Sequence, residues 1–183
     1  FEREAMVDVR RTATASAVPC YGVALGDITG EKPDLLAGVR RSLGTAGIPV
    51  FALPGNHDKY KVDDATPRDA SYFRYTMGPV DYSFNRGKAH IVVMDNVVCT
   101  TTNQSTWTYE AGFSQQQYNW LKADLDLVEN KADKIVFLCC HIPFRNGGEA
   151  TGSNVNKDKY YDETLKLLTQ FKEAHIMIGH THY

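Results

Sequence analysis

The chain has 183 residues, which corresponds to one domain or most of one. Lys and Arg total 20 and Asp and Glu total 22, so the formal net charge is −2 and no basic excess favours a nucleic-acid or membrane-surface partner. A hydrophobic content of 43% and a charged content of 23% exclude a disordered chain. No apolar run approaches the roughly 20 residues of a membrane span.

Hydrophobic periodicity predicts five helices, most of them bounded by turn or capping signals. They cover residues 2–14, residues 34–46, a short segment opened by Pro67, a segment capped by Ser114 with Gln117 completing a capping box, and residues 161–171.

Four short apolar runs predict buried strands over residues 21–25, 48–53, 134–140 and 174–178, and residues 81–84 and 90–94 predict a hairpin. The polar segment 100–112 is predicted as a loop, and residues 145–156, rich in Gly and Asn, as a mobile loop. Strands that alternate with helices indicate a layered α/β domain, and we predict a single domain over residues 1–183.

The four cysteines show no C-x-x-C spacing typical of a zinc or redox site. We therefore expect buried, small hydrophobic side chains at these positions. Cys139 and Cys140 are adjacent, so they point to opposite faces if their segment is a strand.

Polar residues follow four of the predicted strands at the point where each strand ends. They are Gly26-Asp27, Gly55-Asn56-His57-Asp58, His141 and Gly179-His180-Thr181-His182. Ligands bind outside the carboxyl ends of strands in open α/β sheets, so four strands of a shared sheet would bring these side chains to one edge. Carboxylate, amide oxygen and imidazole form a ligand set that suits Mn, Fe or Zn.

Each of these clusters alone has an ordinary structural explanation. A Gly-Asp pair after a strand is typical of a turn, and an isolated histidine at a strand end is typical of a hydrogen-bonded, partly buried side chain. His180 and His182 point the same way only if their backbone stays extended. All four clusters occupy the same place relative to their strands, and this combination favours a metal site.

These stretches resemble the calcineurin-like metallophosphoesterase superfamily. The matching motifs are GDIT (26–29), PGNHD (54–58), CHIPF (140–144) and GHTH (179–182), and GFSQQQYNWL (112–121) resembles the helix before the His-bearing strand in many members. The resemblance runs from about residue 21 to residue 182 and implies a four-layer α/β/β/α sandwich, here incomplete at both ends, with a two-metal centre at its rim.

The resemblance also implies a role for each motif residue. Asp27 would bridge two divalent metal ions, Asn56, His141 and His180 would complete the ligand set of one ion, and His182 would bind the other. His57 would protonate the leaving oxygen or steady the transition state, with Asp58 orienting it. These roles agree with elementary chemistry, because a carboxylate has two oxygens and an imidazole free of metal can carry a proton near neutral pH.

The first motif of the family, an Asp-x-His after an N-terminal strand, has no counterpart in the chain. Asp8 lies in the first predicted helix, and the first histidine is His57. We therefore expect a piece of a longer protein whose first motif lies upstream; the alternative is a natural one-metal or inactive relative. We expect this piece to hold at most one metal ion firmly and to hydrolyse generic phosphodiesters weakly or not at all.

Substrate-binding candidates rest on weaker patterns. Arg145, four residues past His141, could bind a phosphate through its guanidinium fork, although a solvated loop arginine is the plainer interpretation. Trp107 and Tyr109 could stack on a substrate ring, although simple packing is the more ordinary role.

Four further polar residues lie beside the motifs or in the strands. For Asp95 and Asn96, which follow the hairpin, we favour a structural turn over support of the site. For His90 and His175, which lie in or at the start of strands, we favour a structural role.

The predicted function is metal-dependent hydrolysis of a small-molecule phosphomonoester or phosphodiester. One alternative is a catalytically impaired binding module, supported only by the missing motif. A metallonuclease is another, disfavoured by the near-zero net charge. The resemblance leans toward an exported bacterial protein, with a cytoplasmic one as the alternative, and the oligomeric state stays open.

Overall fold

The computed structural model describes residues 2–101, 108–144, 154–155 and 160–182. The helices are α1 (Glu2–Ala15), α2 (Leu36–Leu43), α3 (Ser71–Met77), α4 (Gln115–Asp126) and α5 (Tyr161–Leu168), with short 3-10 turns at Pro33–Leu35, Gly44–Ala46, Asn56–Asp58 and Lys131–Asp133. The strands are β1 (Gly22–Ala24), β2 (Val50–Ala52), β3 (Tyr82–Arg86), β4 (Ala89–Val93), β5 (Val97–Cys99), β6 (Tyr109–Ala111), β7 (Ile135–Cys139), β8 (Asn154–Val155) and β9 (Glu173–Met177).

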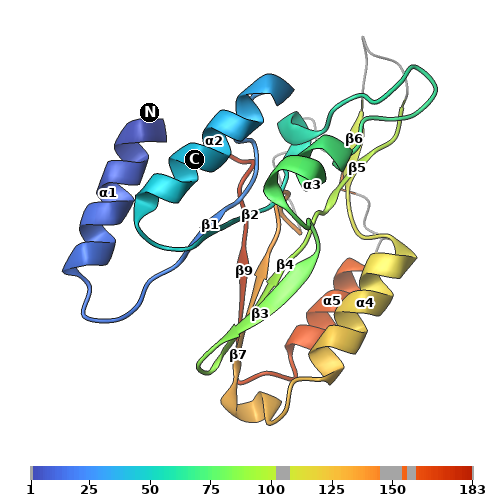
Figure 1. Cartoon of the computed structure of the whole chain (residues 1–183). Coiled ribbons are helices and arrows are strands. Elements are labelled where there is room, and N and C mark those ends of the chain that lie inside the picture. Colours follow the sequence, from blue (N-terminus) through green and yellow to red (C-terminus); the bar gives the residue numbers. More distant parts are fainter. Residues whose placement is uncertain (1, 102–107, 145–153, 156–159, 183) are drawn as a thin grey trace.

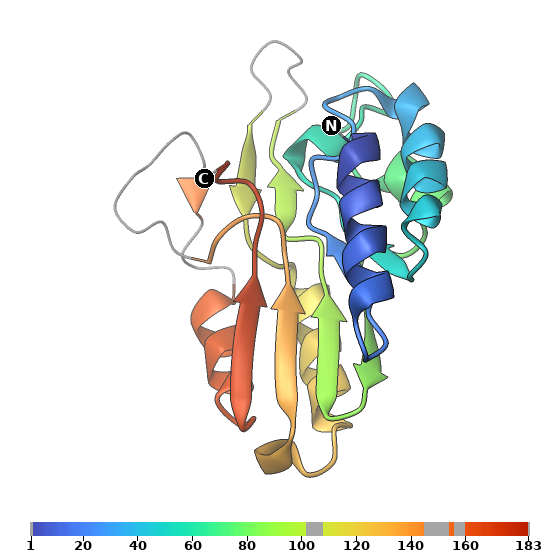
Figure 2. The ribbon, with the colours of Figure 1, turned by 90° about the vertical axis from the view of Figure 1, so that its left-hand side faces the viewer.

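The largest sheet has four strands in the order β3-β4-β7-β9 (Figures 1 and 2). The predicted hairpin is confirmed as the antiparallel pair β3–β4, and β4, β7 and β9 run parallel. The inner strands β4 and β7 are apolar on both faces. Cys139 and Cys140 accordingly enter different hydrophobic clusters, as their adjacent positions predict.

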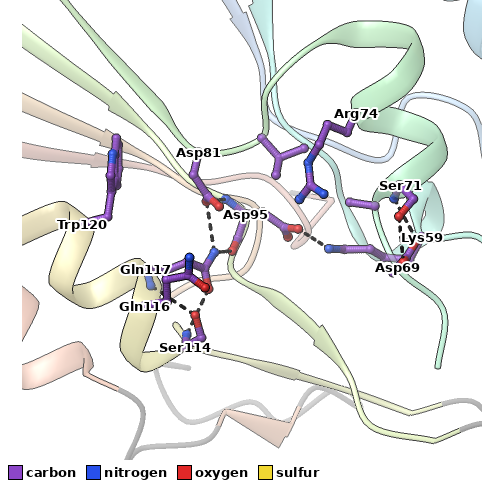
Figure 3. Close-up of a pocket in the computed structure, with 12 residues that line it drawn as sticks. Lys59, Asp69, Ser71, Arg74, Asp81, Asp95, Ser114, Gln116, Gln117 and Trp120 are labelled. Carbon is purple, nitrogen blue, oxygen red and sulfur yellow. Dashed lines mark hydrogen bonds and ion pairs between the residues drawn. The ribbon is translucent and has the colours of Figure 1, made fainter. Parts of the chain in front are cut away.

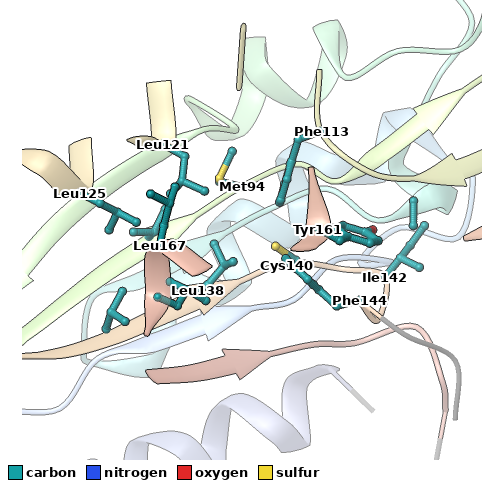
Figure 4. Packing of buried hydrophobic residues seen from close by; sticks show 14 of the residues in the cluster. Met94, Phe113, Leu121, Leu125, Leu138, Cys140, Ile142, Phe144, Tyr161 and Leu167 are labelled. Carbon is teal, nitrogen blue, oxygen red and sulfur yellow. The ribbon is translucent and has the colours of Figure 1, made fainter. Parts of the chain in front are cut away.

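Helices α4 and α5 cover one face of this sheet. Their apolar side chains pack with alternate residues of β4 and β7 around Phe113 and Tyr161 (Figure 4). The start of α4 is set by the predicted capping box, in which Ser114 Oγ accepts from Gln117 N at 3.1 Å and Gln117 Oε1 accepts from Ser114 N at 2.9 Å.

The other face of the sheet packs against a second, two-stranded parallel sheet made of β1 and β2. Alternate residues of the first strand segment, Tyr21, Val23 and Leu25, contact the cluster formed by Leu53, Ile91, Val93 and Cys139. A third cluster joins α2 and α3 to residues of β2, and α1 lies beside α2 (Figure 1). The chain is thus a mixed α/β structure with helices and several sheets.

The prediction that the four motif-bearing strands share one sheet is wrong. β1 and β2 form their own sheet, whereas β7 and β9 belong to the four-stranded one. The place beside β7 is taken by β4, whose apolar run is buried on both faces. The two sheets stack face to face, and the loops that follow β1, β2, β7 and β9 still meet, as the contacts at His141 described below demonstrate.

Three smaller predictions also need correction. The predicted helix 34–46 is divided into a 3-10 turn, α2 and a second 3-10 turn. Helix α3 begins at Ser71, where Asp69 accepts from both the backbone and the hydroxyl of Ser71, and Pro67 does not open it. The predicted loop 100–112 contains β6, which pairs with β5, because three-residue strands carry too few residues to show a period.

None of the helices in the described ranges is both long enough and apolar enough to cross a membrane.

Candidate metal centre

Three of the predicted ligands come together from segments that are far apart in the sequence. Ligand atoms of Asp27, His141 and His180 all lie within 4.8 Å of one another. Each residue sits in the loop after a strand: Asp27 after β1, His141 after β7 and His180 after β9. The strand-end pattern of the sequence therefore located a real cluster, although two sheets rather than one deliver it.

His141 is the centre of this cluster, and its ring is oriented by the backbone. Its Nδ1 lies 2.7 Å from the carbonyl oxygen of Leu25, which can only accept a hydrogen bond. Nδ1 therefore carries the proton, and Nε2 is left with a free electron pair. A ligand histidine whose other ring nitrogen donates to a backbone carbonyl is the usual arrangement in metal sites.

The free Nε2 of His141 faces three other electron-pair donors. It lies 3.1 Å from Asn56 Oδ1, 3.2 Å from Asp27 Oδ2 and 3.2 Å from His180 Nδ1. Asp27 Oδ2 is fully buried and has no hydrogen-bond donor among the described residues. Converging electron pairs are satisfied by a cation, so these residues fit a bound metal ion.

The ionisation of the cluster suits ligand chemistry. Burial raises the pKa of Asp27, but the neighbouring His141 and the backbone N–H of His57 outweigh it, so the pKa lies below the ordinary value and the group is a carboxylate. Burial, followed by the charge of His141, lowers the pKa of His180, whose ring is therefore neutral near pH 7. Metal ligands must be deprotonated in this way.

The loops at the cluster adopt a backbone that side chains rarely take. Asp27 (φ 56°), His180 (φ 68°) and His182 (φ 54°) are left-handed, which costs roughly 1–3 kcal/mol each. Such strain concentrates at functional sites.

Gly55 has a different role, because a Cβ there would lie 2.1 Å from Asp27 Oδ1. Only glycine allows the second motif loop to approach the carboxylate this closely.

Asp58 does not orient His57 as predicted. Its buried carboxylate accepts from the backbone of Ile28 at 3.1 Å, of Thr29 at 3.2 Å and of Gly55 at 3.0 Å. The reason is local: Asp58 lies in a 3-10 turn, where its side chain folds back to cap Gly55 and projects away from that of His57. Asp58 instead fastens the GDIT loop to the PGNHD loop.

His57 is half exposed at the edge of the cluster and contacts a residue that the sequence did not reveal. Its backbone N donates to Asp27 Oδ1 at 3.0 Å, and its Nδ1 lies 3.0 Å from Glu31 Oε1. The other oxygen of Glu31 lies 3.5 Å from Arg68. In the sequence, Glu31 follows the GDIT motif closely, but no pattern in the sequence indicates that its side chain faces His57.

The remaining predicted site residues lie outside the cluster. His182 is exposed, and its backbone is left-handed, so the extended backbone on which a shared direction with His180 depended is not present. Arg145 and Trp107 fall outside the described residues. Tyr109, predicted as a packing residue, places its ring edge-on to His180 with centroids 6.0 Å apart.

One large cavity lies away from these ligands. It measures about 600 Å³ and opens between α3 and α4, where Lys59, Asp81, Asp95, Gln117 and Trp120 line it (Figure 3). None of the candidate ligands borders it. Chemistry rather than cavity size therefore locates the candidate site.

Comparison with known proteins agrees with this geometry. No curated protein matches the chain. The sequence profile of the calcineurin-like phosphoesterases matches residues 23–183, a range that includes every motif described above. The chain belongs to the calcineurin-like phosphoesterase family, whose chemistry is metal-dependent phosphoester hydrolysis.

Proposed function

We propose that the chain is the main part of a phosphoester hydrolase domain with a dinuclear metal centre. The observation that carries this proposal is the convergence of Asp27, Asn56 and His180 on Nε2 of His141. The stacking of β1–β2 on the four-stranded sheet, with helices outside both, supports a four-layer α/β/β/α sandwich as the architecture of the complete domain.

The described cluster would hold one of the two ions. Asp27, Asn56, His141 and His180 would be its ligands, and Mn, Fe or Zn suit this donor set. The second ion would take Asp27 as a shared ligand and His182, together with residues outside this chain. Two ions held there would neutralise the charge of a bound phosphate and would lower the pKa of a water molecule beside it.

His57 is the proposed general acid. Its ring belongs to the loop that contacts Asp27, yet its Nδ1 is directed to Glu31 rather than to the ligand cluster. A half-exposed imidazole with a carboxylate on one nitrogen can hold a proton on the other and release it to the leaving oxygen. Glu31 would orient the ring of His57, and Arg68 would hold Glu31 in place.

The proposal for the substrate names a class of compound rather than a single one. A small phosphomonoester or phosphodiester is the proposed substrate, and Arg145 the proposed additional phosphate ligand. A binding module without turnover is tested by the same measurements, and a metallonuclease is tested by adding single- and double-stranded DNA as substrates.

The proposal expects a longer natural protein that carries the missing Asp-x-His motif upstream, and the test compares residues 1–183 with that longer protein. Each is loaded with Mn²⁺, Zn²⁺ or Fe²⁺, analysed for bound metal, and assayed with bis-p-nitrophenyl phosphate and p-nitrophenyl phosphate. We expect one firmly bound ion and slow turnover for residues 1–183, and two ions with rapid turnover for the longer protein. Absence of metal from both would overturn the proposed function, and metal without turnover in both would favour the binding module.

A further inference from the structure

We propose that Asn96 is a positioning residue for His141, holding the backbone of the CHIPF loop so that the ligand nitrogen faces Asp27 and Asn56. The inference rests on the proposed function, since His141 has a ligand to offer only if the site binds metal. Asn96 belongs to none of the matched motifs; it follows β4, three residues after that strand ends.

The side-chain amide of Asn96 forms hydrogen bonds with the CHIPF loop through both its oxygen and its nitrogen. Its Oδ1 accepts from the backbone N of His141 and from that of Ile142, both at 3.0 Å. Its Nδ2 donates to the carbonyl oxygen of Ile142 at 2.8 Å and, more weakly, to the hydroxyl of Tyr161 at 3.4 Å. The side chain is fully buried, so water does not compete for these bonds.

These bonds act at the place where the sheet can no longer hold the backbone. β7 ends at Cys139, and the N–H groups of His141 and Ile142 have left the ladder. On its other side, His141 is held by Gly179, whose backbone N donates to the His141 carbonyl oxygen at 3.0 Å. Asn96 and Gly179 together therefore fix the peptide from which the imidazole projects.

Fixing that peptide fixes the ligand nitrogen. The ring of His141 has one further anchor, the bond from Nδ1 to the Leu25 carbonyl oxygen, which lies on the other sheet. A small rotation of the backbone would break this bond or turn Nε2 away from Asp27 Oδ2, 3.2 Å away. The position needs two acceptor sites and a donor in one plane, which asparagine supplies and a carboxylate or an aliphatic side chain does not.

The neighbouring Asp95 makes contacts that differ from those of Asn96. Its carboxylate forms an ion pair with Lys59, the residue after the PGNHD motif, and accepts from Val97 N at 3.1 Å (Figure 3). Asp95 therefore fastens the chain toward the PGNHD loop, while Asn96 fastens it toward the CHIPF loop. The two residues make different attachments.

The test measures Mn²⁺ affinity by calorimetry in the full chain, well below the unfolding temperature. Asn96→Leu, which has a similar size and no hydrogen bonds to offer, should weaken binding 10–100-fold, as loss of partners behind metal ligands does. Tyr161→Phe removes only the weak contact and should change affinity less than twofold. Leu125→Ala, a buried cavity variant on α4, should lower the unfolding temperature and leave affinity unchanged.

A second measurement does not depend on metal. In the metal-free chain, ¹⁵N NMR of the imidazole should find His141 protonated at Nδ1 in the wild type and in Leu125→Ala, and a mixture of tautomers in Asn96→Leu. If Asn96→Leu does not fold, Asn96→Ala replaces it without the extra bulk.

The outcomes separate the two proposals. Wild-type Mn²⁺ affinity and a wild-type tautomer in folded Asn96→Leu would overturn the role of Asn96, as would an equal loss of affinity in Leu125→Ala. If the wild type binds no metal while the tautomer still depends on Asn96, the proposed function fails and the positioning role stands.

Discussion

Two buried histidines of this chain, His90 and His141, have polar neighbours at both ring nitrogens, but the neighbours differ. Nδ1 of His90 lies 2.8 Å from Asn85 Oδ1, and its Nε2 lies 2.9 Å from Asp124 Oδ2. The second oxygen of Asp124 accepts from Ser83 at 2.6 Å. Each ring nitrogen of His90 therefore has a single oxygen neighbour, to which an N–H of the ring can donate.

At His141, one ring nitrogen has a hydrogen-bond acceptor as its partner, whereas the other nitrogen faces several atoms that all offer electron pairs. Its Nδ1–H is matched by the Leu25 carbonyl oxygen, but its Nε2 faces a carboxylate, an amide oxygen and a second imidazole nitrogen. The comparison teaches that burial and a carboxylate neighbour do not distinguish a ligand histidine from a structural one. The distinguishing feature is the number of electron-pair donors that meet at one ring nitrogen, which is three at His141 Nε2 and one at each nitrogen of His90.

The largest expected effect comes from removing the aspartate carboxylate that lies beside each of these two histidines. Asp27→Ala should abolish metal binding and, with it, the rise in unfolding temperature that Mn²⁺ gives the wild type. At 100 times the dissociation constant that stabilisation amounts to about 2.7 kcal/mol. The measurement is thermal unfolding with and without Mn²⁺.

Asp124→Ala is the matched control for Asp27→Ala. It removes the carboxylate beside His90 and should cost about 1–3 kcal/mol of unfolding free energy, because a buried hydrogen-bonded group loses its partner. Its response to Mn²⁺ should equal that of the wild type. A metal response that survives in Asp27→Ala but disappears in Asp124→Ala would reverse the comparison.

The next largest effect concerns His57, a histidine that belongs to neither cluster. His57→Ala should lower turnover in the longer protein by about 10²–10⁴-fold, the usual contribution of a general acid, while bound metal stays unchanged. His175→Ala is the control, because His175 is also half exposed and lies 3.6 Å from a glutamate, Glu173. Loss of metal from His57→Ala would show that His57 is a ligand and would refute its proposed role.

Much of the fold follows from patterns within single segments. The hairpin, the capping box at Ser114 and the apolar runs 48–53 and 134–140 each depend on neighbours in the sequence, and each is found in the structure. The distribution of strands between two sheets was not predictable in this way. It depends on β4 pairing with β7, a contact between residues more than forty positions apart.

The site was predictable to the same extent. Strand ends and motif spacing brought Asp27, His141 and His180 together in advance. They did not reveal Glu31 beside His57 or the bonds of Asn96, because a loop side chain takes its direction from the tertiary structure. The pairing of Asp58 with His57 failed for a related reason, since adjacent residues in a 3-10 turn point in different directions.

Glu31 offers a smaller effect than either histidine cluster. Glu31→Gln keeps the contact to His57 but removes the charge, so turnover in the longer protein should fall about tenfold, near the low end for a charged hydrogen bond at a half-exposed position. The loss should appear in kcat rather than KM. A loss confined to KM would mean that Glu31 holds the loop and does not act through the ring of His57.

The smallest expected effect is a pH dependence that belongs to the His90 cluster alone. Burial raises the pKa of Asp124, but hydrogen bonds from His90 and Ser83 outweigh it, so the folded pKa lies below the ordinary value. A lowered carboxyl pKa adds stability at pH values above the unfolded-state pKa, and that stability is lost as the pH falls through the folded pKa. Asp124→Asn keeps a neutral acceptor, so it should cost about 1 kcal/mol at pH 7 and nothing at the acid end.

Chemical unfolding of both proteins across the acid range, with chelator present, measures this difference directly. Asp27 also has a lowered pKa, but it is common to the two proteins, and its contribution cancels in the difference between the two curves. A difference that grows with added Mn²⁺ would contradict the separation of the two clusters, because the His90 cluster is complete without a metal and should not respond to one.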